Sequence, residues 1–423
     1  MAEESFLTDD FVRQLTAVGE VDVLIGIPAL NNHKTIERVV EAAQVGLVKY
    51  FQRERTVVIV ADGGSRDGTV DKVTSSLALD FRSMLASSPL RTVHRLATTY
   101  AGIQGRGSAV RVLMAAADLL RAKACALISP DLQSITPEWI ESLVRPVLRE
   151  GFDFVTPVYH RHKFDGLLVK NLISPMMSAV YRSKVREPVG SELGFSGRFA
   201  CHCLEQSVWH EKAIRFGVEV WMSAQAMVND FRICQSFLGP KIHVSQPVGE
   251  TLVGTIQQVV GSLFDSLEKH ESFWLGHSGT QAVPSFGFKY SVALEPIRLN
   301  KKLMLKMFRS GTEQLSAVLQ SILSAETLGR IEAARKLSDD DFRFPDDLWV
   351  QTVYEFACSY HHSVINRDHL LQALTPLYRG RMASFVLQNH GADGEIIERK
   401  LDELTAQFER LKPGLDQNWA RKT

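Results

Sequence analysis

The chain has 423 residues, 45% of them hydrophobic, which is enough to bury a large core and to form two domains. Lysine plus arginine equals aspartate plus glutamate at 48 each. This balance, without a local basic cluster, excludes a chain built around a nucleic-acid groove, so nucleic acid is not expected as a partner.

The cysteines and the apolar segments indicate a reducing, aqueous compartment. The five cysteines include no C-x-x-C pair, and their odd number does not fit a disulfide framework. The first residues, MAEESFLTDD, lack the pattern of a signal peptide. Lys170 and Asn171 interrupt the apolar run from Leu167 to Tyr181, so no membrane span is expected. We therefore expect a cytoplasmic protein.

Two patterns divide the chain. Up to about Pro240, β-rich apolar runs such as 21–29 and 55–64 alternate with amphipathic segments such as 35–51 and 108–123. That alternation predicts strands joined by crossover helices in a doubly wound sheet. After about Thr251 the periodicity is mostly helical, and residues 273–299 resemble a connector. We expect one domain over residues 1–250 and a mainly helical domain over 251–423.

The first candidate site segment is IGIPALNNHKTI. A strand that ends at Pro28 leaves the backbone of Pro28, Ala29 and Leu30 free to meet a nucleobase, and Asn32 can reach a ribose. An ordinary strand-to-helix turn explains the same residues.

The second segment, ADGGSRDGTVD, follows an apolar strand. Asp62 stands at the strand end, where a carboxylate can bind a base or ribose, and Gly63 permits unusual backbone conformations. A tight turn formed by Asp67 and Gly68 is the competing interpretation.

The third segment is Gly105-Arg106-Gly107-Ser108, directly before an apolar helix. Glycines allow the backbone to approach a phosphate, and Arg106 adds a charged fork at the helix N-terminus. Glycine also occurs before helices for geometric reasons alone.

The fourth segment, LISPDLQSITPEWI, ends an apolar run in Asp131 and then starts a helix at Pro137. This places a carboxylate at the carboxyl edge of the sheet, where ligands of such sheets bind, so Asp131 is a candidate metal ligand. Sugar-nucleotide transferases carry a D-x-D motif here, and Ser129 stands in place of its first Asp.

In this order and spacing, the four segments resemble the nucleotide-binding half of a GT-A glycosyltransferase. Further matches resemble the retaining mannosylglycerate synthase and glucosyl-3-phosphoglycerate synthase group. The resemblance implies a GT-A (Rossmann-like), doubly wound mixed sheet with a mainly helical C-terminal region.

Downstream segments extend the resemblance. REPVGSELGFSGR is similar to the group's acceptor loop, which implies substrate contacts for Gly190, Ser191 and Glu192. The segment that ends in Glu219 resembles one that places a carboxylate near the sugar, and His243 falls where the family keeps a metal-binding His.

One further match and one departure concern the acceptor. YHRHKF resembles the family's acceptor-side basic segment, so Arg161 and Lys163 would meet a carboxylate or phosphate. Thr156 occupies a position that is Arg in the family. The resemblance therefore does not decide whether the acceptor is glycerate or another small hydroxy acid.

The resemblance implies transfer of a hexose from a nucleotide-diphosphate sugar to a small hydroxy acid such as glycerate or 3-phosphoglycerate, with retention. Asp131 and His243 would bind Mg²⁺ or Mn²⁺, and Asp131, Glu192 and Glu219 would be the catalytic residues. An inverting family-two-like glycosyltransferase and a non-catalytic nucleotide-sugar-binding protein remain as alternatives. The C-terminal charge pattern is typical of a solvated helix face, and its apolar stripe also allows homodimer contact.

Overall fold

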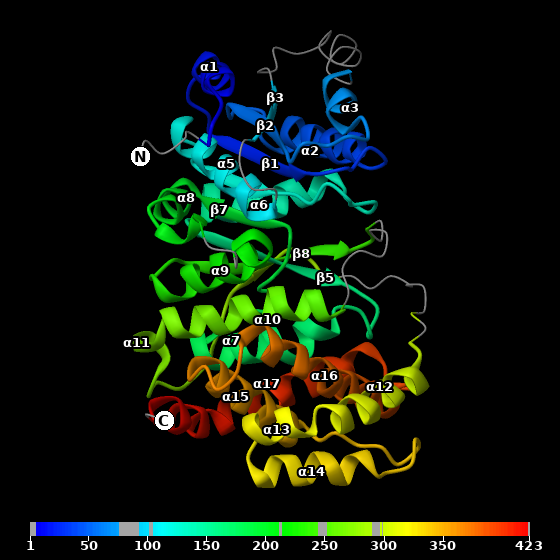
Figure 1. Cartoon of the computed structure of the whole chain (residues 1–423). Helices are drawn as coiled ribbons and strands as arrows, with labels where there is room; N and C mark the ends of the chain where they lie inside the picture. The colour runs from blue at the N-terminus through cyan, green and yellow to red at the C-terminus, as the bar shows by residue number, and fades with distance from the viewer. Residues whose placement is uncertain are drawn as a thin grey trace. The chain divides into compact units, whose positions relative to one another are not determined.

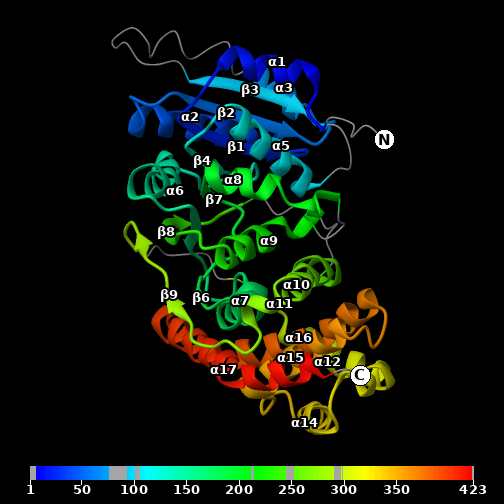
Figure 2. The same ribbon diagram turned by 90° about the vertical axis from the view of Figure 1, so that its left-hand side faces the viewer.

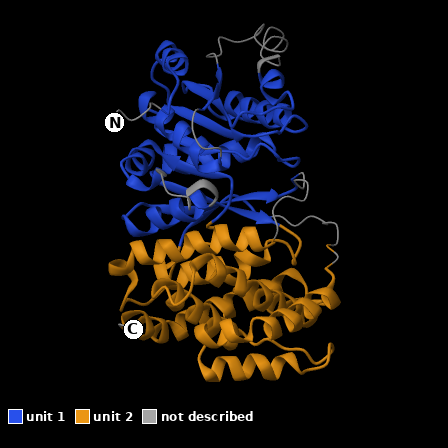
Figure 3. Ribbon diagram, in the orientation of Figure 1, with its two compact units in different colours: residues 1–160, 189–246, 283–292 blue, residues 161–188, 247–282, 293–423 orange. Residues whose placement is uncertain are grey.

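The computed structural model describes residues 6–75, 93–100, 105–210, 214–243, 252–289, 297 and 299–421. The chain forms two compact units, each made of several segments (Figure 3). Unit 1 comprises residues 1–160, 189–246 and 283–292, and unit 2 comprises residues 161–188, 247–282 and 293–423.

Unit 1 contains an eight-stranded sheet in the order β10-β8-β5-β7-β4-β1-β2-β3 (Figures 1 and 2). Neighbouring strands are parallel except that β7 runs antiparallel to both β4 and β5. The mixed α/β sheet expected from the sequence is therefore confirmed. The strands are β1 (Val23–Ala29), β2 (Thr56–Asp62), β3 (His94–Thr99), β4 (Ala124–Leu127), β5 (Phe154–His160), β7 (Leu193–Ser196), β8 (Ile233–Pro240) and β10 (Ser285–Phe286).

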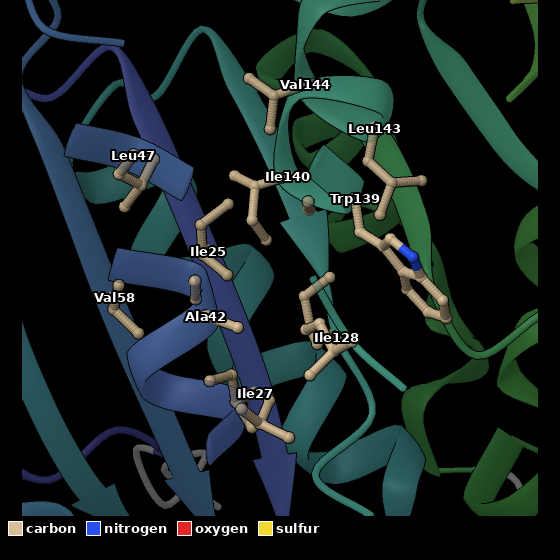
Figure 4. Close-up of a cluster of buried hydrophobic side chains, with 14 of the residues drawn as sticks. Ile25, Ile27, Ala42, Leu47, Val58, Ile128, Trp139, Ile140, Leu143 and Val144 are labelled. Atoms are coloured by element: carbon tan, nitrogen blue, oxygen red, sulfur yellow. The ribbon is translucent and has the colours of Figure 1, made fainter. Parts of the chain in front are cut away.

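The central strands of this sheet are buried along their whole length because helices cover both of its faces. On one face, Ile25 and Ile27 of β1 pack in a core that includes Leu47 of α2 and Ile140 of α6 (Figure 4). On the other face, Gly26 lies so close to α5 that an added Cβ would be 2.8 Å from Leu113. Burial of each such Ile or Leu stabilises the fold by roughly 1.5–3 kcal/mol. The helices of unit 1 are α1 (Asp9–Val18), α2 (Ile36–Tyr50), α3 (Thr69–Ser75), α5 (Arg106–Leu119), α6 (Pro137–Glu150), α8 (Gly197–Leu204), the 3-10 helix η3 (Ser207–His210) and α9 (Ile214–Val228).

The ends of α6 follow from its sequence. Pro137 begins the helix, where a missing N–H costs no hydrogen bond, and Gly151 ends it with a left-handed φ of 72°. The predicted helix start at Pro137 is confirmed.

Unit 2 is mainly helical, as expected for the C-terminal region. It contains the π-helix η2 (Val169–Ile173), α7 (Ser174–Tyr181), α10 (Leu252–Lys269), α11 (Glu271–Trp274), α12 (Lys301–Gln314), α13 (Ser316–Ile322), α14 (Ala325–Arg335), α15 (Asp346–His361), α16 (Arg367–Asn389) and α17 (Gly394–Ala420). Trp349 of α15 is fully buried and donates its indole N–H to the carbonyl of Asn171 at 2.7 Å. In this unit, β6 (Ser183–Lys184) pairs with β9 (Gln281–Ala282) (Figure 2).

The two units interleave along the chain, which differs from the expected division after residue 250. Residues 161–188 belong to unit 2 because η2 and α7 pack against α17. Residues 283–292 return to unit 1, where Ser285 and Phe286 of β10 pair with β8, so the segment expected to be a connector adds a strand to the sheet. The expected boundary itself falls among residues 244–251, outside the described ranges.

Within the ranges that the structure describes, no helix combines the length and the apolar character needed to cross a membrane.

Candidate functional site

The predicted site segments of unit 1 meet at one edge of the sheet. Strands β1, β2 and β4 are parallel, so their carboxyl ends lie on the same edge. Leu193, the first residue of antiparallel β7, pairs with Leu127, the last residue of β4. Glu192 therefore enters the sheet at the edge where β4 leads into Asp131.

The turn after β1 is held by its own side chains. Pro28 and Ala29 lie within β1, and Leu30 is exposed just after it. Asn32 is buried, and its side-chain oxygen accepts the N–H of Leu30 at 2.8 Å. The backbone N–H of Asn32 donates to Thr69 Oγ1 at 2.8 Å. Asn32 thus fixes the shape of the turn, while Leu30 faces solvent.

Asp62 shapes the turn after β2 in the same way. Its carboxylate is 1% exposed and accepts the N–H groups of Gly64 and Ser65 at 2.9 and 2.8 Å. Gly63 donates its own N–H to the carbonyl of Ala29 at 2.8 Å, which ties the first two predicted segments together.

Arg106 is the first residue of α5 and contacts two other predicted site residues. Its Nε donates to the carboxylate of Glu219, and its Nη2 donates to the carbonyl of Ser191 at 2.8 Å. Burial alone would lower the pKa of Arg106, but the negative charges of Glu219, Glu192 and Asp131 raise it above its ordinary value. The guanidinium therefore stays charged at the edge of the sheet. Gly107 follows it and is buried.

A kink in α9 precedes Glu219. Gly217 has non-helical φ and ψ of −113° and 21° inside this helix, two residues before Glu219. Glu219 is 7% exposed, so its charge needs the contact with Arg106.

Glu192 is the most deeply buried charge of this site. It is fully buried, and its Oε2 accepts from Lys241 Nζ at 2.8 Å and from the hydroxyl of Tyr159. Burial would raise the pKa of Glu192, but Lys241, Tyr159 and Arg106 together lower it, so the carboxylate is ionised. Its other oxygen, Oε1, is buried without a hydrogen-bond partner among the described residues. That oxygen can accept one further hydrogen bond.

Lys241 and Tyr159 are site residues that the sequence did not single out. Both stand at the carboxyl ends of paired parallel strands, because Tyr159 and Gly239 are register partners in β5 and β8. Lys241 comes two residues before His243, the predicted metal ligand. This closeness in sequence is the one clue that could have identified Lys241 as a site residue.

The two predicted metal ligands lie on neighbouring segments. Leu132 and His243 form an antiparallel bridge, and Gln133 donates its N–H to the carbonyl of Ile242 at 2.9 Å. Asp131, which precedes this bridge, is half-buried, and His243 is exposed. The structure's described part holds no group of three or more His, Cys, Asp or Glu side chains fit to bind a metal. A cation held by Asp131 and His243 would thus need oxygen ligands from a diphosphate and water.

The acceptor-side residues are divided between the units. Gly190 is buried and Ser191 is half-buried in unit 1, next to Glu192. Thr156 is fully buried in β5, and its hydroxyl has no partner among the described residues, so this position offers no charge. Arg161 belongs to unit 2, where its guanidinium lies 3.9 Å from the carboxylate of Glu187.

Lys163 also belongs to unit 2, where its ammonium binds backbone carbonyl groups. Its Nζ donates to the carbonyls of Asn389, His390 and Ala392 at 3.1, 2.6 and 2.8 Å. These three bonds cap the C-terminal end of α16 and use all three N–H donors of the ammonium. The substrate contact expected for Lys163 remains a prediction, and this geometry favours a capping role.

Comparisons with known proteins gave structural matches only. No protein-family model matches the chain, and no curated protein sequence does. Solved structures of glucosyl-3-phosphoglycerate synthase from Mycobacterium tuberculosis are similar to it. The complex with Mn²⁺, UDP and glucosyl-3-phosphoglycerate is 21% identical, with 63% of this chain and 86% of that chain covered and a TM-score of 0.43. The complex with Mg²⁺ and UDP is also 21% identical, covers 62% and 84%, and has a TM-score of 0.43. The complex with Mn²⁺, UDP-glucose and glycerol 3-phosphate is 20% identical, covers 63% and 86%, and has a TM-score of 0.41. A similarity of this size assigns no activity, so the proposal below rests on the site residues.

Proposed function

We propose that this chain is a glycosyltransferase that moves a hexose from a nucleotide-diphosphate sugar to a small hydroxy-acid acceptor. The observation that carries the proposal is the charged network at the carboxyl edge of the sheet. There Arg106 contacts Glu219 and the Ser191 carbonyl, and Lys241 contacts buried Glu192.

The side chains of Arg106 and Lys241 place two positive charges at this edge, where they can stabilise the departing diphosphate. Sugar transfer leaves negative charge on the diphosphate while the sugar gains oxocarbenium character, and preorganised positive groups stabilise that charge. Arg106 offers a planar fork and Lys241 a point charge, and each is held in place by a buried carboxylate. The two carboxylates thus hold Arg106 and Lys241 in place.

Glu192 and Glu219 are proposed to organise hydroxyl groups. Glu192 Oε1 has no partner among the described residues and is buried, so it would accept a hydrogen bond from a substrate hydroxyl once the neighbouring side chains move to expose it. Glu219, on α9, accepts a hydrogen bond from the guanidinium of Arg106. Because Arg106 is proposed to bind the diphosphate, this position supports a contact between Glu219 and the donor sugar. Fixing both substrates in a reactive geometry supplies much of the rate enhancement in such a site.

Asp131 and His243 are proposed to hold Mg²⁺ or Mn²⁺. Their positions on paired segments fit two ligands of one cation, with the remaining ligands supplied by diphosphate and water. When bound, the cation would neutralise charge on the leaving diphosphate.

The stereochemistry and the acceptor are the finer parts of the proposal. The resemblance of the sequence motifs implies retention, and we propose same-face attack by the acceptor hydroxyl. Glycerate and 3-phosphoglycerate are the proposed acceptors, with Arg161 as the group that would meet their carboxylate or phosphate. Phosphoglyceric acid and UDP-glucose occur together in two solved structures of the similar synthase, so this pair is tested first.

The test is nucleoside-diphosphate release from UDP-, GDP- and ADP-sugars with Mg²⁺ or Mn²⁺, measured with and without glycerate and 3-phosphoglycerate. We expect acceptor-stimulated release that a chelator stops and that Asp131→Asn abolishes. Asp340→Asn, at an exposed position in unit 2, is the matched control and should leave release unchanged.

Two other outcomes would replace the proposal. Ser129 in place of an Asp favours a binding protein that has lost turnover, and donor binding without release under any condition would establish that reading. Release coupled to inversion at the anomeric carbon would indicate an inverting family-two-like enzyme instead.

A further inference from the structure

Tyr100 lies directly after β3, where it contacts the second and third of the candidate site segments identified in the sequence, which contain Gly63 and Gly105. It is buried, and its backbone N–H donates to the carbonyl of Asp62 at 3.2 Å. Tyr100 therefore lies where the parallel strands β2 and β3 end, at the same edge of the sheet as the candidate site.

The hydroxyl of Tyr100 holds both backbone groups of one glycine. It donates to the carbonyl of Gly105 at 3.1 Å, and the N–H of Gly105 donates back to it at 3.4 Å. This exchange fixes the peptide planes that lead into Arg106, the first residue of α5. Burial raises the pKa of Tyr100, so the hydroxyl keeps its proton and remains a donor.

The same hydroxyl lies against Gly63. A Cβ added to Gly63 would be 2.9 Å from the Tyr100 oxygen and 3.3 Å from Leu30. Such a distance to the oxygen is too short for a real Cβ, so only glycine fits while the hydroxyl is in place. Gly63 in turn donates its N–H to Ala29. One hydroxyl therefore contacts the second and third predicted donor segments, and Gly63 links it to the first.

We infer that Tyr100 is a positioning residue for the nucleotide donor, which sets the phosphate-side segment at Gly105–Arg106 against the nucleoside-side turn at Gly63. This inference rests on the proposed function and goes beyond it, because none of the sequence motifs includes Tyr100. Preorganising two segments before the ligand arrives improves affinity by reducing the cost of ordering them on binding. The role is in donor affinity.

The experiment is calorimetric titration of UDP, GDP and ADP with Mg²⁺ into the wild-type protein and Tyr100→Phe. The variant keeps the ring and loses only the hydroxyl. For the nucleotide that the wild type binds, we expect the Kd to rise about three- to tenfold, the change that loss of one or two hydrogen bonds produces. In steady-state assays the KM for the donor should rise by a similar factor while kcat stays within about twofold. A purely structural role would not give this split.

Gly63→Ala provides an independent variant. Its new Cβ should displace the Tyr100 hydroxyl and weaken nucleotide binding, and Gly63→Ala/Tyr100→Phe should bind no more weakly than Gly63→Ala alone. Tyr50→Phe is the matched control, since the Tyr50 hydroxyl, on α2, donates to Glu138 in an exposed hydrogen bond outside the candidate site.

Equal Kd values for the wild type and Tyr100→Phe would overturn the inference and leave the proposed function standing. The same conclusion would follow if the affinity losses of Gly63→Ala and Tyr100→Phe added up in the double variant. A wild-type protein that binds none of the three nucleotides would overturn both.

Discussion

Arg106 at the start of α5 donates to the carboxylate of Glu219 on α9, 113 residues further along the chain. The pair joins two helices of unit 1 beside the sheet edge where Asp131 and Glu192 lie. Because both side chains are largely withdrawn from solvent, each depends on the other for charge compensation. We therefore expect changes at either residue to act on the other.

Glu219→Gln should lower both turnover and donor affinity. The substitution removes the charge that holds Arg106, and a hydrogen bond to a charged group contributes about 1.5–3 kcal/mol, or roughly ten- to a hundredfold in kcat/KM. Steady-state kinetics with the donor identified by the release panel measures the change. Glu205→Gln, at an exposed position at the end of α8, is the control. Unchanged kinetics in Glu219→Gln would remove Glu219 from the site.

Lys241→Met should destabilise the protein strongly. It would leave the carboxylate of Glu192 buried without its closest cation, which costs about 3–5 kcal/mol. Urea unfolding of Lys241→Met, Glu192→Gln and the double variant separates the pair interaction from the individual losses. We expect the double variant to be more stable than Lys241→Met alone, whereas additive losses would show that the two side chains are not coupled.

The contribution of Glu192 to stability should depend on pH. Its pKa in the folded state lies below the ordinary value of 4.5, so the folded protein binds this proton less readily than the unfolded chain. That contribution is present above the unfolded pKa and is lost as pH falls through the folded pKa. The stability difference between wild type and Glu192→Gln should be widest above about pH 5 and shrink below it. Unfolding curves between pH 3 and 7 measure it, and a difference that grows as the pH falls would contradict the assignment.

Lys163→Met should weaken the fold and leave the acceptor KM unchanged. The ammonium caps the end of α16 through three carbonyls, and its loss should cost about 1–3 kcal/mol. Thermal unfolding gives the stability, and acceptor titration gives the KM. Lys302→Met on exposed α12 surface is the control. A raised acceptor KM with unchanged stability would instead support the substrate contact expected from the sequence.

Much of the sheet could be predicted because its signals are local. Apolar runs and amphipathic segments predict strands and helices at 21–29, 35–51, 55–64 and 108–123, and β1, α2, β2 and α5 begin and end within four residues of those limits. The interleaving of the units could not be predicted in this way. Strand β10 is two residues long, and pairing with β8 depends on a partner about 50 residues earlier, which local periodicity does not encode.

The sequence predicted the turns of the candidate site, but it did not predict which side chains contact each other there. Asp62 and Asn32 were singled out because they follow strands, yet their oxygens mainly accept backbone N–H groups of their own turns. Lys241 and Tyr100 were missed because neither lies in a recognisable motif. Their roles come from contacts with Glu192 and Gly105, which only the folded chain brings together.

The most direct measurement of the central claim is mass spectrometry of the protein incubated with ¹³C-labelled UDP-glucose, 3-phosphoglycerate or glycerate, and Mn²⁺, with the other nucleotide sugars of the panel run alongside. We predict a new species equal in mass to the acceptor plus one labelled hexosyl group, which is absent with Asp131→Asn and with chelator. A nucleotide sugar that binds but yields neither a glycosylated acceptor nor free nucleoside diphosphate would contradict this prediction.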